Sequence, residues 1–374
     1  MSKSWWLEDL PPLHSARVFS PDIEIIGAGV TGSSCALSLA RAGMRVRVHD
    51  AREVAGGASG RNGGFALRGG AQAYDKAVEF LGRDVAREYW QLTEEYLERL
   101  AALAGDALTR TGSLRIAADD EEREELRAEY EALRADGFHA EWRDKLAPPL
   151  AGRFRAAIFH PPDASVQPAR AVRRLAEAAA EAGAEFVEHH RVESLDELEA
   201  ERVVVATDGY PSGLLGELEG LIIPTRGQML ATEPLAERLF AMPHYGRHGF
   251  DYWQQLDDGR IVVGGFRDAA LDTEFTDVEE TTAVIQDALE QFVASLVGRR
   301  LEVTQRWAGI FGLVLDFLPV VGRHPDDERI WVAGGYSGHG NVLGFMCGDL
   351  VAQALLGGPH PLLPTFDPAR LVAA

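Results

Sequence analysis

The chain has 374 residues, and at roughly 150 residues per domain this length predicts about two domains. Its composition, with 46% hydrophobic and 25% charged residues, is that of an ordinary globular protein, and its formal net charge of -21 opposes binding to nucleic acid or to an anionic membrane surface. Two cysteines allow no disulfide framework, no apolar run reaches the roughly 18 residues of a membrane span, and the N-terminus lacks a signal-peptide pattern. We therefore expect a cytoplasmic protein without nucleic-acid or membrane partners.

The first strong pattern predicts a strand, a glycine-rich turn and a helix, in that order. Residues 23–26 form a short β-branched run typical of a buried strand, and residues 35–42 form a helical pattern that Gly43 ends. Residues 45–50 then alternate in polarity like a second strand. These elements predict a βαβ unit that follows an N-terminal arm of residues 1–17.

Along the rest of the chain, segments that resemble this βαβ unit alternate with segments of a different pattern. A glycine-dense loop spans residues 56–70, and the other predicted elements follow it in chain order. They are a helix over 74–103, a strand over 112–117, helices over 119–135 and 167–182, strands over 185–192, 202–206, 228–232 and 261–264, a helix over 278–297, strands over 303–307 and 330–333, and a helix over 342–356. The nucleotide-binding style recurs at the start, in the middle and at the end, which predicts a discontinuous two-domain layout.

The turn Gly27-x-Gly29-x-x-Gly32 carries the dinucleotide-binding pattern, because it follows a predicted strand and opens a helix. In this pattern the first glycine permits a tight turn, the second lets the backbone approach a pyrophosphate, and the third lets helix and strand pack closely. The positive end of the helix favours the phosphates. Asp50 ends the second strand, where a carboxylate accepts hydrogen bonds from ribose hydroxyls. The sequence therefore predicts an adenine dinucleotide site.

The loop over residues 56–65 bears on which dinucleotide is bound. It is too long and too glycine-rich for an ordinary crossover. Its backbone amides and Ser59 suit a pyrophosphate and a ribityl chain, and only a flavin possesses the latter. The loop therefore favours FAD, and an NAD-dependent dehydrogenase stays an alternative.

A series of short motifs extends along nearly the whole chain. In order they are IIGAGVTG at residues 25–32, GASGRNGG at 57–64, TGSL at 111–114, VVVATDGY at 203–210, RWAG at 306–309, Pro319-x-x-Gly322-Arg323, and GYSGHG at 335–340. With this series the chain resembles the FAD-dependent oxidoreductases of the D-amino acid oxidase, glycine oxidase and sarcosine oxidase family. The resemblance implies a mixed α/β fold with a discontinuous Rossmann-type FAD-binding domain of residues 18–73, 155–220 and 317–366. It also implies a substrate domain of residues 74–154 and 221–316, built on a large, mostly antiparallel β-sheet.

The fingerprint, the loop and the resemblance together assign residues to FAD. In the family, backbone corresponding to Val192 and Ala206-Thr207 approaches the nucleotide, and residues 338–341 open a helix whose positive end faces the flavin ring. The predicted FAD contacts are Gly27, Gly29, Val30, Thr31, Gly32, Asp50, Ala51, Arg52, Ala58, Ser59, Gly60, Arg61, Asn62, Gly63, Val192, Ala206, Thr207, Gly309, Gly338, His339, Gly340 and Asn341. The family's flavin-tethering cysteine is absent after Trp307, so we expect FAD to be noncovalent, and we expect no metal.

Two departures from the family bear on the reaction. Phe311 stands where the glycine and D-amino acid oxidases carry an arginine for the substrate carboxylate, and a buried unpaired carboxylate is costly. The segment after Trp307 is more similar to the γ-glutamylputrescine oxidase branch, whose members act on an amine at the end of a chain. The lysine that promotes oxygen reaction in sarcosine-oxidase relatives has no counterpart near residues 259–267, so O2 or another electron acceptor stays open.

The residues expected around the substrate are Tyr252, Trp253, Arg267, Phe311 and His339. Aromatic walls exclude water and attract cations, and Arg267 is placed to orient a distal carboxylate. The resemblance implies that a primary or secondary amine is oxidised by hydride transfer to flavin N5, and that the resulting imine hydrolyses.

Two alternatives stay open at this point. One is a glycine, sarcosine or D-amino acid-type oxidase in which Arg267 or Arg61 replaces the missing arginine. The other is a flavin-binding subunit without catalysis. The sequence names neither the amine nor the oligomeric state.

Overall fold

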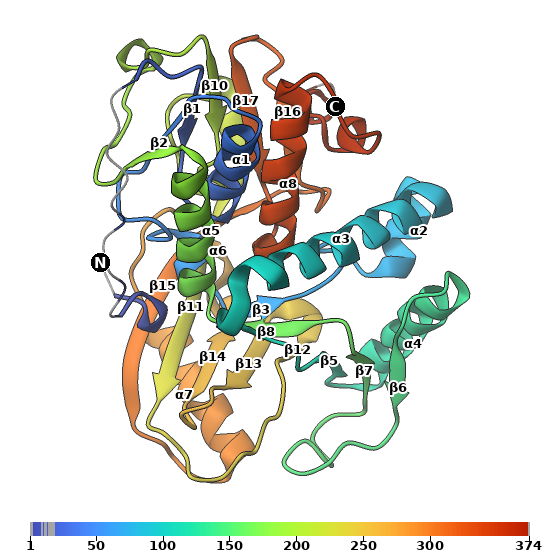
Figure 1. Cartoon of the computed structure of the whole chain (residues 1–374). Helices are drawn as coiled ribbons and strands as arrows, with labels where there is room; N and C mark the ends of the chain where they lie inside the picture. The colour runs from blue at the N-terminus through green and yellow to red at the C-terminus, as the bar shows by residue number, and fades with distance from the viewer. Residues whose placement is uncertain (1–2, 9, 11–12, 14–18, 373–374) are drawn as a thin grey trace.

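The computed structural model describes residues 3–8, 10, 13 and 19–372, which form two large β-sheets and the helices that cover them (Figure 1). A third, small sheet consists of β3 (Phe65–Ala66), β8 (Ala164–Val166) and β4 (Leu108–Thr109). The mixed α/β fold class predicted from the sequence is confirmed.

The first large sheet has six strands and is mostly parallel. In spatial order these are β16 (Val320–Arg323), β17 (Ile330–Gly334), β10 (Arg202–Val205), β1 (Ile23–Ile26), β2 (Val46–His49) and β9 (Glu185–Val187). Only the edge strand β16 runs antiparallel to its neighbour. All four residues of β1 are buried, as expected for a central parallel strand covered on both faces.

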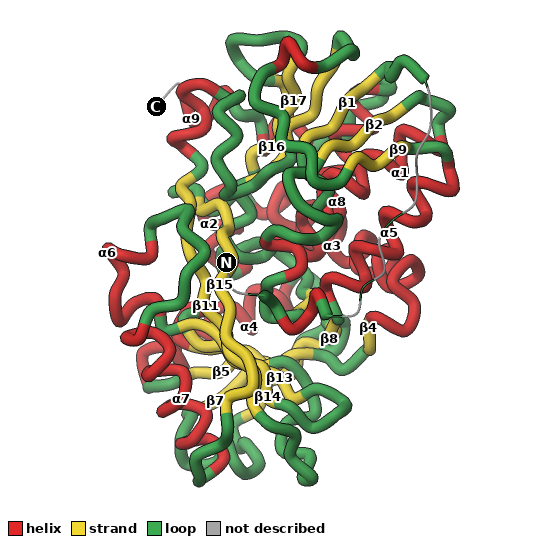
Figure 2. The backbone as a smooth tube through the Cα atoms, turned by 90° about the vertical axis from the view of Figure 1, so that its left-hand side faces the viewer, coloured by secondary structure: helices red, strands yellow, loops and turns green. Residues whose placement is uncertain are grey.

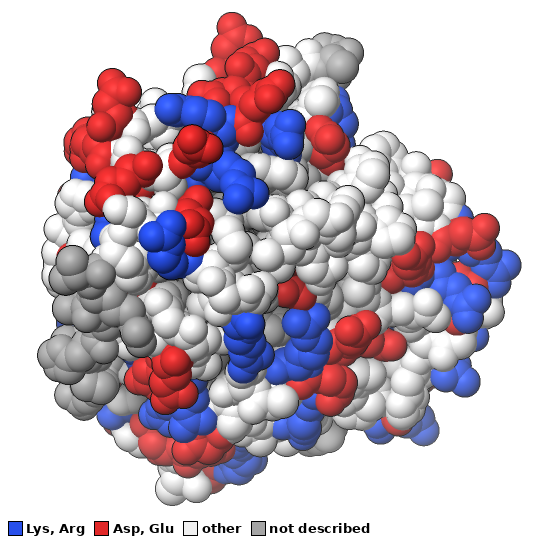
Figure 3. All heavy atoms as spheres, turned by 45° about the horizontal axis from the view of Figure 1, so that its top comes forward, with Lys and Arg blue, Asp and Glu red and all other residues white. Residues whose placement is uncertain are grey.

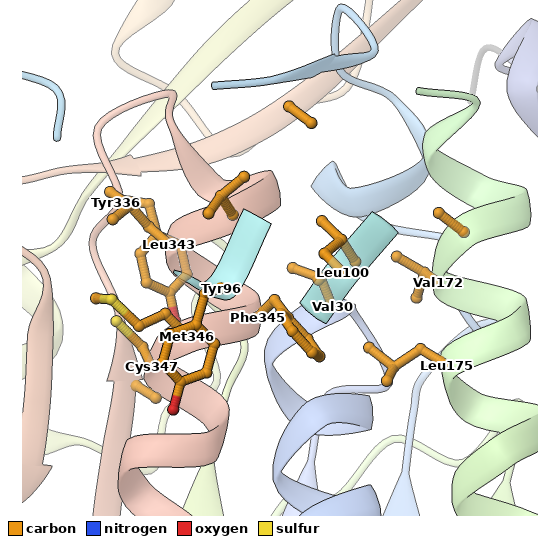
Figure 4. Close-up of a cluster of buried hydrophobic side chains, with 14 of the residues drawn as sticks. Val30, Tyr96, Leu100, Val172, Leu175, Tyr336, Leu343, Phe345, Met346 and Cys347 are labelled. Atoms are coloured by element: carbon orange, nitrogen blue, oxygen red, sulfur yellow. The ribbon is translucent and has the colours of Figure 1, made fainter. Parts of the chain in front are cut away.

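Three helices cover the face of this sheet that is turned toward the viewer in Figure 1: α1 (Val30–Arg41), α5 (Pro168–Ala182) and α8 (Gly340–Leu355). Small residues let α1 and α8 approach closely, because a Cβ on Gly348 would lie 2.2 Å from the Thr31 carbonyl oxygen. The long helix α3 (Arg83–Ala104) packs against α5 and α8. Figure 4 shows the resulting core, where Leu100 of α3 and Val172 of α5 lie near Val30 of α1.

The second large sheet has eight strands and is mostly antiparallel. In spatial order they are β15 (Val303–Leu313), β11 (Ile223–Thr232), β14 (Ile261–Gly265), β13 (Asp251–Gln255), β12 (His244–Gly246), β5 (Ser113–Ala117), β7 (Ala156–His160) and β6 (Glu141–Arg143). The one parallel pair is β12 with β5. Helix α7 (Ala283–Val297) packs against β11 and β14. The remaining helices are α2 (Tyr74–Leu81), α4 (Asp120–Ala135), α6 (Leu271–Glu274) and α9 (Ala369–Val372).

Several predicted element boundaries were wrong, each for a local reason. The helix expected over 74–103 is two helices, α2 and α3, because Gly82 takes a left-handed φ of 80° between them. The strand expected over 185–192 stops at Val187. The helix expected from residue 278 begins only at Ala283, because the Thr282 amide donates to the Gln228 side chain and the preceding segment is irregular.

The two longest strands extend beyond their predictions. β11 and β15 lie side by side along their whole lengths (Figure 2). In their register Gly227 lies directly opposite Gly309. Glycines weaken a strand pattern in sequence, so the predicted strands ended or began beside them. The sequence-based division into domains stays a prediction, and β7, which its boundary at residue 155 assigns to the nucleotide side, pairs with β5 and β6 in the eight-stranded sheet.

The surface mixes both charge signs. On the face that Figure 3 shows, acidic and basic side chains lie interspersed. In the part of the chain that the structure describes, no helix is both long and apolar enough to cross a membrane.

Candidate active site

A cavity of about 330 Å³ is lined by residues of both large sheets and of the loops at the carboxyl ends of β1, β2 and β10. This is the edge at which open α/β sheets bind ligands. The cavity therefore has one part formed by the six-stranded sheet and another formed by the eight-stranded sheet.

The turn after β1 presents bare backbone to the first part. Gly27 has a φ of 105°, and a Cβ there would lie 2.6 Å from the Ala206 carbonyl oxygen. A Cβ on Gly32 would lie 1.9 Å from the Gly27 carbonyl oxygen, so helix α1 packs against the turn as closely as backbone allows. The N-terminus of α1 thus opens beside the cavity at the bare backbone of Gly27 and Gly29, an arrangement that favours an anion.

Asp50 lies next to this turn at the end of β2. One carboxylate oxygen accepts from the Ala28 amide at 2.6 Å, and the other accepts from the Arg52 amide at 2.8 Å. Burial raises the pKa of Asp50 to about 6, although both backbone donors oppose the shift. A carboxylate accepts more than two hydrogen bonds, so Asp50 keeps capacity for hydroxyl donors.

The loop of residues 56–64, hereafter the glycine loop, is tied to three elements around the cavity. The Ser59 hydroxyl accepts from the Val30 amide of α1 at 3.0 Å. The Asn62 and Asn341 side chains exchange two hydrogen bonds of 3.1 Å, which tie the loop to the start of α8. The Trp307 indole of β15 donates to the Arg61 carbonyl at 2.9 Å.

Most of the residues assigned to FAD from the sequence line this cavity. They are Gly27, Gly29, Val30, Thr31, Asp50, Ala51, Arg52, Ala58, Ser59, Arg61, Asn62, Gly63, Val192, Ala206, Thr207, Gly309, Gly338, His339, Gly340 and Asn341. Gly32 and Gly60 do not line it, because both are packed against backbone, and a Cβ on Gly60 would lie 2.3 Å from the Ala55 carbonyl oxygen.

Of the five residues expected around the substrate, four line the cavity and Trp253 does not. Successive side chains of a strand point to opposite faces, so Tyr252 faces the cavity and Trp253 faces α7. The Trp253 ring is fully buried there, stacked on His244 with ring centroids 5.1 Å apart. Because Tyr252 and Trp253 are adjacent on one strand, this alternation already shows that both side chains cannot line the same cavity.

Two ionisable rings of the second part, Tyr252 and His339, are uncharged near neutral pH. Burial raises the pKa of Tyr252 to about 12, so its phenol keeps its proton. Burial, and then the charge of Arg115, lower the pKa of His339 to about 4, so its imidazole is neutral. The His339 Nδ1 atom is buried without a hydrogen-bond partner among the described residues. Phe65 meets Tyr252 edge-on, with ring centroids 6.2 Å apart.

Arg267 supplies a cation to this part of the cavity. Its guanidinium lies 4.3 Å from the ring centroid of Phe250 and 5.7 Å from that of Phe311. It makes no hydrogen bond or ion pair with any residue that the structure describes, and burial lowers its pKa. Arg61 is engaged by contrast, since it donates to the Gly56 and Ala308 carbonyls at 2.8 and 3.1 Å.

The cavity's two carboxylates lie elsewhere and are engaged. Among the described lining residues, only Asp50 and Asp208 are acidic. Asp208 accepts from the Gly335 amide at 2.8 Å and from the Gly312 amide at 3.0 Å, and burial raises its pKa. No carboxylate therefore faces Arg267 across the cavity.

Sequence reasoning missed two carboxylates that organise the site. Asp208 follows β10 within a quoted motif, and its position after a parallel strand was a usable signal. Glu279 lies in the irregular segment before α7 and reaches across to Arg52, which donates to both of its oxygens at 2.9 Å. Glu279 also accepts from the Tyr210 hydroxyl and lies 3.6 Å from Arg61. No sequence pattern pointed to Glu279.

The cavity fits an extended anionic dinucleotide with a second ligand beside it. Two helix N-termini, α1 and α8, and the bare backbone at Gly27 and Gly29 border the first part, and the second part leaves aromatic walls and a free cation. Cys35 and Cys347, the chain's two cysteines, are buried outside it. The lysines Lys3, Lys76 and Lys145 also lie outside it.

Comparison with known proteins agrees with this geometry. Residues 22–354 match the model of the family described as FAD dependent oxidoreductase, DAO. The chain is 28% identical over 363 residues to glycine oxidase of Bacillus licheniformis, covering 90% of this chain and 94% of that protein. It is 28% identical over 365 residues to gamma-glutamylputrescine oxidoreductase of Escherichia coli, covering 90% and 84%. The crystal structure of glycine oxidase from Geobacillus kaustophilus shares the fold, with a TM-score of 0.77 at 24% identity over 94% of this chain and 98% of that one. The chain therefore belongs to the FAD-dependent oxidoreductase family, and its cofactor is FAD.

Proposed function

We propose that this protein oxidises the carbon–nitrogen bond of a primary or secondary amine that also carries a carboxylate. Arg267 is the observation that supports the carboxylate: its partly buried guanidinium lines the cavity and has no hydrogen-bond or ion-pair partner among the described residues. A charge held partly out of water is better stabilised when a ligand of opposite charge pairs with it. Arg267 thus takes the role that Phe311 cannot take, and it comes from the end of β14 rather than from β15.

FAD is held, in this proposal, by the residues of the first part of the cavity. The Gly27–Gly32 turn and the N-terminus of α1 bind its pyrophosphate, Asp50 accepts from its ribose, and the glycine loop and the start of α8 border its ring system. When bound, FAD supplies the two-electron acceptor for the oxidation. The position of both cysteines outside the cavity supports noncovalent binding.

The chain's own residues prepare the amine for this reaction. Arg267 binds the carboxylate and fixes the orientation of the substrate, and Tyr252 and Phe311 exclude water from it. A free cation and the lack of a free carboxylate nearby both disfavour the ammonium form, so the cavity favours the neutral amine that can be oxidised. His339 lines the cavity and its imidazole is neutral, so it adds no charge beside the amine.

The two substrate classes that the sequence left open differ in the distance between the amine and the carboxylate. A short distance corresponds to a glycine- or sarcosine-like substrate, and a long one to a chain-like amine with a distal carboxylate. The test is anaerobic bleaching of the visible flavin absorption by glycine, by sarcosine, by a long amino acid with a terminal amine, and by the diamine of matching length. We expect bleaching by at least one carboxylated amine and none by the diamine. Bleaching by the diamine alone would refute the role of Arg267.

Asp50 predicts a pH dependence of cofactor binding. Because ribose hydroxyls donate to the ionised carboxylate and the pKa is about 6, FAD affinity is expected to be constant above that pH and to weaken as the pH falls through it. For folding of the apoprotein the sign is opposite. The raised pKa stabilises the fold below the ordinary value of 3.8, and this contribution is lost as the pH rises through about 6. Titration of apoprotein with FAD between acidic and neutral pH measures the first effect, and Asp50→Asn should remove the inflection.

A further inference from the structure

A short segment outside the family-matched residues 22–354 is packed as tightly as core. Residues 3–7, hereafter the N-terminal brace, contain a 3-10 helix (η1, Trp5–Leu7) that Ser4 caps. Trp6 is 2% exposed and Ser4 is fully buried. A segment of this length cannot bury itself, so its burial depends on what it packs against.

The brace packs on the glycine loop, on the side away from the cavity. The Trp6 indole Nε1–H donates to the Asn62 carbonyl at 2.8 Å. The Trp6 ring covers Gly64, where a Cβ would lie 3.1 Å from it, and Leu7 covers Gly60, where a Cβ would lie 2.9 Å from it. Trp6 itself does not line the cavity.

The brace is in turn held by the start of α5 and by the eight-stranded sheet. The Gln167 side chain, at the start of α5, donates to the Trp6 carbonyl at 2.9 Å. The Gln305 side chain of β15 donates to the Lys3 carbonyl at 2.9 Å. The Arg260 guanidinium lies 4.7 Å from the ring centroid of Trp5. The brace therefore links α5, which covers the six-stranded sheet, to β15 of the eight-stranded sheet.

A hydrogen-bond path leads from Trp6 through the glycine loop to the cavity. Trp6 fixes the backbone of Asn62, and the Asn62 side chain exchanges two hydrogen bonds with Asn341. The side-chain nitrogen of Asn62, Nδ2, also donates to the Ala58 and Ser59 carbonyls. Asn62 and Asn341 both line the cavity, so Trp6 is linked through Asn62 to the cavity wall and to the start of α8.

We propose that the N-terminal brace preorganises the FAD site, and that Trp6 is a positioning residue acting through the Asn62–Asn341 pair. A loop that is already ordered loses less freedom when its ligand binds, which raises affinity without a new contact. The inference rests on FAD binding at this cavity, and FAD binding by the wild-type apoprotein is the control that separates the two. If the wild type bound no FAD, the proposed function would fail before Trp6 was tested.

The experiment is a double-mutant cycle on the dissociation constant of FAD. Trp6→Phe keeps a ring in the core and removes the N–H donor, and Trp5→Phe makes the same change one residue away from the loop. Apoprotein is titrated with FAD and followed by flavin fluorescence. Trp6→Phe is expected to raise the dissociation constant about three- to tenfold, the usual effect of one lost hydrogen bond, and Trp5→Phe to leave it within about twofold. In an Asn341→Ala background, Trp6→Phe should change it by less than about twofold.

A merely structural role of Trp6 would give a different result. It would lower the melting temperature while leaving the FAD dissociation constant unchanged, or it would raise that constant equally in both backgrounds. Either result overturns the proposal. If the Trp6→Phe apoprotein cannot be kept folded, the rate of FAD release from the holoproteins gives the same four-way comparison, because affinity differences among variants lie mainly in dissociation.

Discussion

Replacing Arg267 by leucine is expected to lower kcat/KM for a carboxylated amine by about 100-fold, the equivalent of about 3 kcal/mol for the lost partner of a buried charge. The physical reason is that the substrate carboxylate then enters an apolar cavity with no cation to pair with it. The measurement is steady-state kinetics with the best substrate from the bleaching experiment, together with the FAD content of the variant. Arg267→Lys keeps the charge without the planar fork, and it should retain part of the activity.

Two controls make this result specific. Arg323→Leu removes an exposed arginine that does not line the cavity, and it should leave kcat/KM unchanged. An amine without a carboxylate should be oxidised as slowly by the wild type as by Arg267→Leu. Equal losses of turnover for substrates with and without the carboxylate would mean that Arg267 acts on the fold or on FAD, and that the proposed recognition is wrong.

Replacing Glu279 by glutamine is expected to destabilise the apoprotein by about 3 kcal/mol, because breaking a buried ion pair from one side leaves the other charges uncompensated. Glu279 is 6% exposed and accepts from Arg52, while Arg61 lies within ion-pair distance. In a chain of 374 residues such a loss lowers the melting temperature by roughly 4 °C. Thermal melts of the apoprotein and the holoprotein measure it.

The effect of replacing Glu279 is expected to differ between the apoprotein and the holoprotein. In the proposed binding mode the FAD pyrophosphate would bring two negative charges near Arg52 and Arg61, which line the cavity, so it should offset part of the lost charge, and the drop in melting temperature should be smaller in the holoprotein. Glu280→Gln is the matched control, since the neighbouring carboxylate is exposed and should change neither value by much. A Glu279→Gln apoprotein as stable as the Glu280→Gln apoprotein would contradict the account of this cluster.

The sequence predicted those parts of the site that depend on local backbone geometry. The turn at Gly27, the carboxylate of Asp50 and the glycine loop all follow from a short run of residues whose function requires bare backbone or a strand end. Their positions in the cavity could therefore be anticipated without the fold. The mostly antiparallel sheet was anticipated from the resemblance, and the strand pairing in the structure confirms it.

The parts that escaped prediction depend on contacts between distant segments. Glu279 reaches the site because residues before α7 do not continue the helix that their pattern favours, and tertiary hydrogen bonds decide that outcome. Trp253 was misplaced because the register of β13 relative to the cavity is set by its neighbours β12 and β14. The Trp6 contact joins residues far apart in sequence, and no local pattern encodes it.

The facing glycines of β11 and β15 make different demands on the chain. A Cβ at Gly309 would lie 2.8 Å from the Arg61 Cβ, so packing requires that glycine. A Cβ at Gly227 would meet the Tyr252 hydroxyl at 3.6 Å and the Phe311 ring at 3.8 Å, which are ordinary contact distances. The fold thus tolerates a methyl group at position 227, beside two residues that line the cavity. A larger residue at position 227 would therefore narrow the cavity and exclude larger substrates without disturbing the fold.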